Sequence, residues 1–259
     1  MLTLGFDTSN YTTSVAAFDG VGGKNCSRLL DVKPGELGLR QSDALFAHIK
    51  RLPELVDALC ASVNIGNVTA IGVSTRPRAV EGSYMPCFLA GESAASYAAE
   101  ISGVPKYKTS HQAGHVMAAL YSSCVNNNTD MRELLGEEFI AFHVSGGTTD
   151  LLLVKPDEKE LFEIDGIGGT RDINGGQAID RAGVMMGLSF PCGAEMDKAA
   201  LGFNGKVTRT KLSVDGTECN LSGLENKSAE IYKKSGDIAE TSAYVLDFIT
   251  RTPKSWRKR

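Results

Sequence analysis

Runs of apolar residues divide the chain into segments of two kinds. Short runs rich in β-branched residues predict strands, and apolar residues that recur every three or four positions predict amphipathic helices. We expect strands at 2–6, 12–18, 70–74, 139–144 and 150–154. We expect helices at 44–59, 91–101 and 111–121, and a loop at 34–41. Strands and helices that interleave in this way predict an α/β protein.

One pattern occurs twice along the chain. A buried strand ends in small polar residues and a second strand returns, first at Asp7-Thr8-Ser9 and again at Ser145-Gly146-Gly147. An internal duplication of this kind indicates two similar lobes. Paired hairpins line the phosphate cleft in two-lobed ATP-binding folds of the actin, sugar-kinase and Hsp70 type. We therefore predict an N-terminal lobe at 1–125 and a C-terminal lobe at 126–259, with the boundary in the asparagine-rich segment 124–130.

Composition narrows the class of protein without fixing its function. The chain has 259 residues, of which 42% are hydrophobic, enough for two lobes. The net charge is −4, so any contact with nucleic acid needs a local patch or a partner protein. The six cysteines include no C-x-x-C pair and predict free thiols. The first residues do not form a signal peptide, and no apolar run is long enough for a membrane span. We therefore expect a cytoplasmic protein that does not contact membranes.

The strongest candidate for metal chemistry is the segment His111-Gln112-Ala113-Gly114-His115. Residues four apart lie on one side of a helix, so both imidazoles can reach one divalent ion. Two histidines without an ion would show the same spacing, and the spacing alone leaves both possibilities open. A zinc protease needs a glutamate directly after the first histidine as its general base. Gln112 cannot take a proton, which disfavours a peptidase.

Two glycine-rich segments indicate nucleotide binding. The backbone at Gly146 and Gly147 can approach an anion closely, while amides and hydroxyls donate to phosphate oxygens. An ordinary hairpin turn is the alternative. Farther along, the polar segment 168–177 is expected to be a loop that leads into a helix carrying Asp180. A carboxylate there can accept hydrogen bonds from a ribose hydroxyl, although a solvated aspartate would look the same.

In this order, the motifs resemble the TsaD/Gcp family. Its members are tRNA threonylcarbamoyladenosine synthases that were once described as O-sialoglycoprotein endopeptidases. The resemblance extends from Leu4 to about Phe248. The motifs that carry it are Gly5-Phe6-Asp7-Thr8-Ser9, Gly91-Glu92-Ser93-Ala94-Ala95, the two histidines around Gly114, Val144-Ser145-Gly146-Gly147, Ala178-Ile179-Asp180, Pro191-Cys192-Gly193 and, more weakly, Asn220-Leu221-Ser222-Gly223-Leu224.

The resemblance implies an α/β fold of the ASKHA type (actin, sugar kinase and Hsp70-like). It also implies one divalent ion, iron or zinc, and ATP or a threonylcarbamoyl-adenylate in the cleft. The threonylcarbamoyl group would pass to the adenosine next to the anticodon of a tRNA, with the help of partner proteins. Carried over position by position, the metal ligands are His111 and His115, the phosphate-binding residues are His143, Val144, Ser145, Gly146 and Gly147, and the nucleoside side is lined by Asp180 and Gly193.

This chain departs from the family pattern at several places. Asn10-Tyr11-Thr12-Thr13 replaces Cys-Asp-Glu-Thr, Asp150 replaces a glutamine, and Cys192-Gly193 replaces Gly-Gly. A carboxylate at Asp150 should weaken anion binding. The family continues into an Asp-Asn-Gly-Ala segment that supplies the third metal ligand, whereas this sequence ends with a basic tail, 252–258, that we expect to be solvated. We predict a C-terminally shortened, divergent member with an incomplete second lobe.

Two functions other than a transferase stay open. A catalytically impaired paralogue would act as a nucleotide-binding scaffold, in a homodimer or in a heterodimer with another family member. A metallo-glycoprotease is the less favoured alternative.

Overall fold

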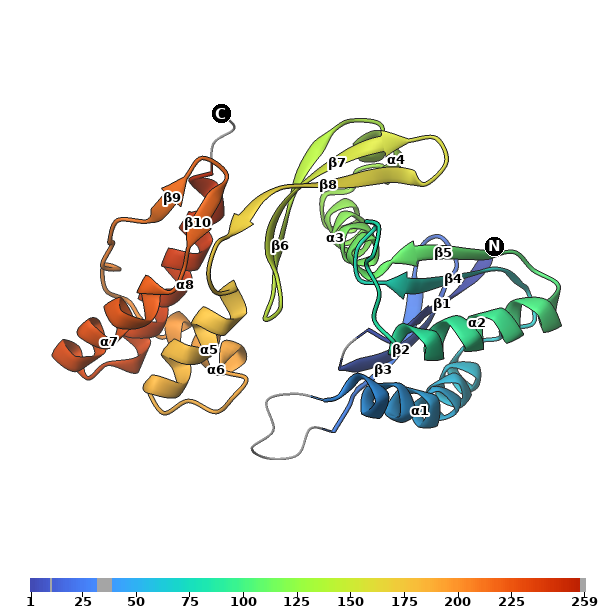
Figure 1. Cartoon of the computed structure of the whole chain (residues 1–259), viewed down its shortest axis with the longest axis horizontal. Helices are drawn as coiled ribbons and strands as arrows, with labels where there is room; N and C mark the ends of the chain where they lie inside the picture. Colours follow the sequence, from blue (N-terminus) through green and yellow to red (C-terminus); the bar gives the residue numbers. More distant parts are fainter. Residues whose placement is uncertain (10, 32–38, 257–259) are drawn as a thin grey trace. The chain divides into compact units, whose positions relative to one another are not determined.

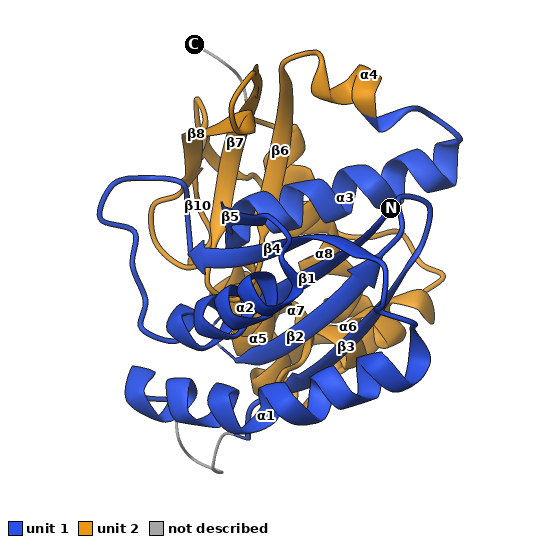
Figure 2. Ribbon diagram, turned by 90° about the vertical axis from the view of Figure 1, so that its right-hand side faces the viewer, with its two compact units in different colours: residues 1–131 blue, residues 132–259 orange. Residues whose placement is uncertain are grey.

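The chain divides into two compact units, Met1–Met131 and Arg132–Arg259 (Figure 2). The computed structural model describes residues 1–9, 11–31 and 39–256, so most of the loop expected at 34–41 lies outside the described residues. Whether the units act as the predicted lobes 1–125 and 126–259 stays a prediction. Each unit is described by itself below.

Unit 1 is built on a five-stranded sheet. Its strands are β1 (Leu2–Asp7), β2 (Thr12–Phe18), β3 (Gly23–Leu29), β4 (Val68–Arg76) and β5 (Lys106–Ser110). The strand order is β3-β2-β1-β4-β5 (Figure 1). The first three strands pair antiparallel, and β4 and β5 continue the sheet in parallel from β1. This order and pairing are those of an ASKHA lobe and confirm the predicted fold class.

The helices of unit 1 lie on both faces of this sheet. Helices α1 (Gln41–Ser62) and α2 (Phe88–Ser102) pack on one face, where Phe6, Val15 and Ile71 belong to a buried apolar core. Successive side chains of a strand point to opposite faces. Asp7 therefore projects to the other face, where it contacts the start of α3 (His111–Asn127).

Unit 2 begins with α4 (Met131–Leu135) at the junction and contains a second five-stranded sheet. Its strands are β6 (Phe139–Val144), β7 (Thr149–Asp157), β8 (Leu161–Thr170), β9 (Ser213–Asp215) and β10 (Glu218–Asn220), in the order β6-β7-β8-β10-β9. Strand β6 opens the duplicated hairpin, as β1 does in unit 1. Within the described residues β6 lies at the sheet edge, whereas β1 is central.

Four helices complete unit 2 and form most of its core. They are α5 (Gly175–Met185), α6 (Gly193–Leu201), α7 (Gly223–Ser235) and α8 (Ile238–Lys254). Their buried side chains include Met196, Leu224, Tyr244, Val245 and Phe248.

Two expectations in unit 2 were wrong. Gly168 and Gly169 belong to β8 instead of a loop, because β8 continues to pair with β7 and then with β10. The segment 252–256 is not a solvated tail, since α8 runs to Lys254 and Thr252 is buried. The Trp256 ring also packs beside Phe142, with the ring centroids 5.7 Å apart.

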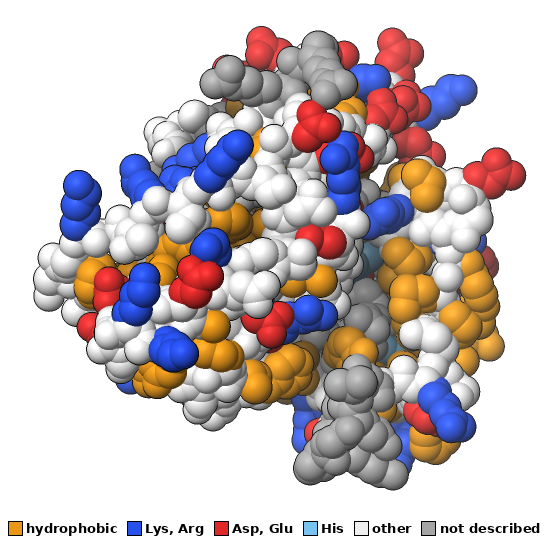
Figure 3. Space-filling view, turned by 60° about the vertical axis from the view of Figure 1, so that its left-hand side comes forward, with side chains coloured by type: hydrophobic (Ala, Val, Ile, Leu, Met, Phe, Trp, Pro, Cys, Tyr) orange, Lys and Arg blue, Asp and Glu red, His pale blue; other side chains and the backbone are white. Residues whose placement is uncertain are grey.

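The remaining expectations concern cysteines, charge and membranes. No disulfide joins any of the six cysteines, all of which the structure describes. On the face drawn in Figure 3, basic and acidic side chains lie among one another, as the small net charge suggests. Among the described helices, none has the length and apolar character needed to cross a membrane.

Candidate functional site

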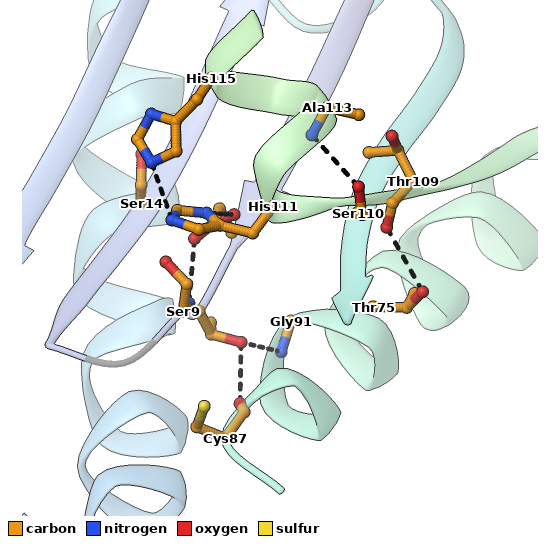
Figure 4. Close-up of polar contacts among 12 residues, drawn as sticks. Ser9, Ser14, Thr75, Cys87, Gly91, Thr109, Ser110, His111, Ala113 and His115 are labelled. Carbon is orange, nitrogen blue, oxygen red and sulfur yellow. Dashed lines mark hydrogen bonds and ion pairs between the residues drawn. The ribbon is translucent and has the colours of Figure 1, made fainter. Parts of the chain in front are cut away.

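The two histidines of the sequence motif meet at the first turn of α3. Ser110 caps the helix, and its Oγ accepts a hydrogen bond from the Ala113 amide at 3.1 Å. His111 and His115 are one turn apart and face each other (Figure 4). Their Nε2 atoms are 2.8 Å apart.

This spacing of the ring nitrogens suits one divalent ion. Two imidazole nitrogens on a tetrahedral zinc, each about 2.1 Å from the metal, lie about 3.4 Å apart. A small rotation of either ring would therefore open room for an ion between His111 and His115. Among the described residues, no third His, Cys, Asp or Glu joins them in a possible metal cluster. The histidines fit two positions of a metal shell.

Asp7 contacts His111 on the other side of its ring. The Asp7 Oδ2 lies 2.9 Å from Nδ1 of His111, and Oδ1 accepts a hydrogen bond from the Ser9 amide at 2.9 Å. The Nδ1 and Nε2 atoms point away from each other, so this carboxylate does not complete a metal shell at Nε2. Asp7 therefore does not supply a third metal ligand and instead supports the pair through Nδ1 of His111.

The electrostatics of the cluster favour a neutral His115 imidazole near an ionised Asp7 carboxylate. Burial by itself would raise the pKa of Asp7, but the hydrogen bond and the charge of His111 outweigh it and hold the pKa well below its ordinary value. Burial lowers the pKa of His115, and the nearby charge of His111 lowers it further. A lowered pKa keeps the His115 imidazole neutral at neutral pH, the state in which it binds metals.

The turn after β1 is fixed to α2 by Thr8, which is fully buried. Its Oγ1 donates to the carbonyl of Cys87 at 2.9 Å and accepts from the Gly91 amide at 3.1 Å. A Cβ atom on Gly91 would lie 2.9 Å from Thr8 Oγ1. The glycine of the Gly91-Glu92-Ser93 motif therefore allows α2 to approach the turn that carries Asp7.

Replacing Gly91 with alanine is expected to lower the free energy of unfolding of unit 1 by about 1–3 kcal/mol, the usual cost of overpacking a buried site. Urea denaturation followed by circular dichroism measures it. Gly114→Ala is the matched control, since nothing lies within 4 Å of a Cβ there. A helical alanine should leave stability equal or raise it by up to about 1 kcal/mol. Equal stability of the two variants would contradict the proposed crowding at Gly91.

The glycine-rich turn between β6 and β7 is closed by its own hydrogen bonds. The Ser145 Oγ accepts from the amides of Gly147 and Thr148 at 3.2 and 3.1 Å. Helix α5 begins directly on this turn, with the Gly176 amide donating to the Ser145 carbonyl at 3.0 Å. An anion would have to compete with Ser145 for two of the turn amides. The phosphate-binding role of Ser145, Gly146 and Gly147 stays a prediction.

The other predicted phosphate ligands, His143 and Val144, are the last residues of β6. His143 pairs with Asp150 across the β6–β7 ladder, and Val144 is partly exposed. They are therefore neighbours of the turn in space as well as in sequence.

The two residues expected on the nucleoside side lie close together. Asp180 on α5 accepts a hydrogen bond from the Cys192 amide at 2.8 Å, and Gly193 starts α6 directly after Cys192. Burial raises the pKa of the Cys192 thiol, and the charges of Asp180 and Glu195 raise it further. This cysteine is therefore a packed thiol and not an activated nucleophile. The nucleoside role of Asp180 and Gly193 stays a prediction.

The sequence did not indicate the role of Asp172, which connects the glycine-rich segment after β8 to the start of α7. Its Oδ1 accepts from the Leu221 amide at 2.8 Å, and its Oδ2 accepts from the Ser222 amide at 3.0 Å. Burial opposes ionisation, but the Ser222 and backbone hydrogen bonds hold the pKa of Asp172 well below its ordinary value. The carboxylate thereby anchors the start of α7. In the sequence, Asp172 is only a short polar residue in a glycine-rich segment. The Leu221 and Ser222 amides lie about 50 residues farther along the chain, so no local pattern indicates these contacts.

Asp172→Ala should destabilise the start of α7 by about 1–2 kcal/mol, the cost of losing a helix cap. Hydrogen exchange at the Leu221 and Ser222 amides should accelerate accordingly. Because the folded pKa of Asp172 is lowered, its stabilisation is complete above the ordinary pKa and is lost as the pH falls through the lowered value. The difference from the wild type should therefore shrink below about pH 4.

Asp165→Ala is the control for this experiment. Among the described residues, the Asp165 side chain forms only an exposed ion pair with Lys155, so its loss should cost less than about 1 kcal/mol. Equal exchange rates at α7 in wild type and Asp172→Ala would contradict the anchoring role.

The fold and the paired histidines together define a protein of the ASKHA class with a candidate metal site on its first unit. Comparison with known proteins specifies the family. The model of the TsaD family, described as tRNA N6-adenosine threonylcarbamoyltransferase, matches residues 38–254. The chain therefore belongs to the TsaD family.

Individual relatives agree with this assignment. Two curated tRNA N6-adenosine threonylcarbamoyltransferases from Streptococcus pneumoniae are each 30% identical, covering 92% and 98% of this chain and 67% and 76% of their own length. A third, from Lactobacillus gasseri, is 30% identical over 69% of this chain and 47% of its own length. The chain thus spans between about half and three quarters of the length of these curated relatives.

Solved structures show weaker similarity. YeaZ from Pseudomonas aeruginosa is 17% identical, with a TM-score of 0.37 over 64% of each chain. The Aquifex aeolicus PPX-GPPA enzyme is 13% identical, with a TM-score of 0.35 over 98% of this chain and 93% of its own.

Proposed function

We propose that this chain transfers a threonylcarbamoyl group from its adenylate to the adenosine next to the anticodon of a tRNA, in a metal-dependent reaction in the cytoplasm. The observation that carries the proposal is the pair of facing Nε2 atoms of His111 and His115 in a member of the TsaD family.

His111 and His115 would hold one divalent ion, iron or zinc, through their Nε2 atoms. When bound, such an ion acts as a Lewis acid on the acyl and phosphate oxygens of the substrate. The residues of the chain then have the tasks of binding and orientation. The low pKa of Asp7 keeps a negative charge beside His111, and the lowered pKa of His115 keeps its imidazole neutral.

Unit 2 would bind ATP or the threonylcarbamoyl-adenylate. His143, Val144 and the Ser145-Gly146-Gly147 turn would contact the phosphates. Asp180 and Gly193, which are neighbours through the Cys192 amide, would contact the nucleoside. The chain carries no excess of basic residues, so tRNA would bind with the help of partner proteins, one of which would be a paralogue of this chain.

A tRNA modification assay tests the proposal. The purified chain, ATP, threonine, bicarbonate and unmodified tRNA are incubated with the partner proteins of a family member, and the nucleosides are analysed by mass spectrometry. Threonylcarbamoyladenosine should appear with the wild type and fall to background with His111→Ala/His115→Ala. Absence of product with a wild type that binds both metal and ATP would reject the transferase.

A second candidate is a nucleotide-binding scaffold that pairs with an active family member. It is favoured by the lack of a third metal-binding side chain among the described residues. In the same assay a scaffold would yield no product alone but would stimulate an active paralogue, with or without its histidines. A glycoprotease is disfavoured further, since Gln112 is an amide and its side chain is buried, 5% exposed.

A further inference from the structure

The His111 ring is held from both of its nitrogen atoms. Nε2 faces Nε2 of His115 at 2.8 Å, and Nδ1 lies 2.9 Å from the Asp7 carboxylate. Asp7 is itself fixed, because its second oxygen accepts a hydrogen bond from the Ser9 amide and its backbone belongs to β1. The contact is partly shielded from water, with the Asp7 and His111 side chains 26% and 32% exposed.

This arrangement determines which ring nitrogen of His111 carries the proton. An ionised carboxylate only accepts hydrogen bonds, so the nitrogen facing it must be a donor. Nδ1 of His111 therefore carries a proton whether the ring is neutral or charged. In the neutral ring, Nε2 is then the nitrogen with the free lone pair. That lone pair points toward His115, where the proposed ion would lie.

We propose that Asp7 is a positioning residue that sets the His111 tautomer and ring orientation for metal binding. This inference rests on the metal site of the proposed function. Asp7 acts through the far nitrogen and does not ligate the ion. A carboxylate behind a metal-binding histidine also makes the imidazole more basic, and losing such a partner typically costs 10- to 100-fold in metal affinity.

A merely structural role for Asp7 would be to close the turn after β1 through the Ser9 amide. Asp7→Asn separates the two roles. The asparagine Oδ1 can still accept from Ser9, while its NH₂ group faces Nδ1 of His111 as a donor. Nδ1 must then accept, the proton moves to Nε2, and the lone pair needed by the ion is lost. The turn stays closed, but the tautomer is inverted.

Asp19→Asn is the matched control. Asp19 lies in the same unit, and its Oδ1 closes the next turn by accepting from the Val21 and Gly22 amides at 2.9 and 2.8 Å. The substitution removes the same charge and keeps the same kind of acceptor, but Asp19 contacts no histidine in the hydrogen bonds of the described residues.

The tautomer is measured first, on the metal-free protein. Two-bond ¹H–¹⁵N correlation spectra of protein labelled in its histidine rings distinguish Nδ1–H from Nε2–H. His111, assigned through a His111→Gln variant, should be protonated on Nδ1 in the wild type and in Asp19→Asn, and on Nε2 in Asp7→Asn. An Nε2–H tautomer in the neutral wild-type ring would overturn the proposal.

Metal affinity is measured second, with Co²⁺ alone in competition with a chromophoric chelator. The dissociation constant should rise about 10- to 100-fold in Asp7→Asn and stay unchanged in Asp19→Asn. If the wild type binds Co²⁺ and Asp7→Asn binds it equally well, the role of Asp7 is overturned and the metal site stands. If the wild type binds no Co²⁺ while His111 is protonated on Nδ1, the metal site itself fails, and the role of Asp7 in it fails too.

Discussion

The double variant His111→Ala/His115→Ala is expected to lose all specifically bound metal, from close to one iron or zinc per chain in the wild type to background. The reason is geometric. The two Nε2 atoms are the only converging pair of imidazole nitrogens in the hydrogen bonds of the described residues, and no other metal-ligating side chain joins them there. Without the two imidazoles, no side chain among the described residues would hold an ion at the first turn of α3.

Elemental analysis by plasma mass spectrometry, on protein purified without chelators or an affinity tag rich in histidine, measures the effect. Ser123→Ala/Asn127→Ala is a matched control, because this pair lies on the same helix at the same spacing and its side chains also contact each other. The control should keep the wild-type metal content. A wild type that carries no more metal than the double histidine variant would reject the metal site, and with it the metal-dependent transferase.

The sequence could predict this pair because its information is local. The four-residue spacing, the Ser110 cap and the helical segment all lie within one stretch of chain, and the helix period brings His115 over His111 without reference to the rest of the fold. The order of the motifs along the chain then indicated the family to which the chain belongs. The strands of the two duplicated hairpins were predictable for the same reason, since a buried strand and its return lie next to each other in the sequence.

The partners of these residues were not predictable, because they come from distant parts of the chain. Asp7 and His111 are 104 positions apart, and their contact depends on how α3 crosses the end of β1. Asp172 reaches Ser222 across 50 positions in the same way. The strands β3 and β5 were missed because their mostly polar residues leave no clear period of apolar positions.

Cys192 illustrates how the fold changes the meaning of a departure from the family. In the sequence it is a cysteine in place of a glycine. In the structure its side chain is fully buried against Gly183 of α5. A Cβ on Gly183 would lie 2.3 Å from Cys192 Cβ and 2.6 Å from its Sγ. The two positions therefore form one packing pair, in which the smaller residue makes room for the larger.

Gly183→Ala should consequently destabilise unit 2 by about 3 kcal/mol, at the upper end of the usual cost of overpacking. Neither Cys192 atom can move away easily, because the Cys192 amide is bound to Asp180 at 2.8 Å. Separating α5 from α6 would break that bond and draw Asp180 away from Gly193. We therefore also expect ATP affinity to fall at least tenfold. Urea denaturation and calorimetric titration with ATP measure the two effects.

The double variant Gly183→Ala/Cys192→Gly should reverse most of the loss, because it removes the side chain that the new methyl group meets. Cys192→Gly alone provides the fourth corner of a double-mutant cycle. It should be mildly destabilising, since it leaves a cavity where the buried thiol lies and adds a flexible glycine. A coupling energy near zero between the two positions would show that the close approach of α5 and α6 does not limit stability. The contact between Gly183 and Cys192 would then no longer support the placement of Asp180 beside Gly193.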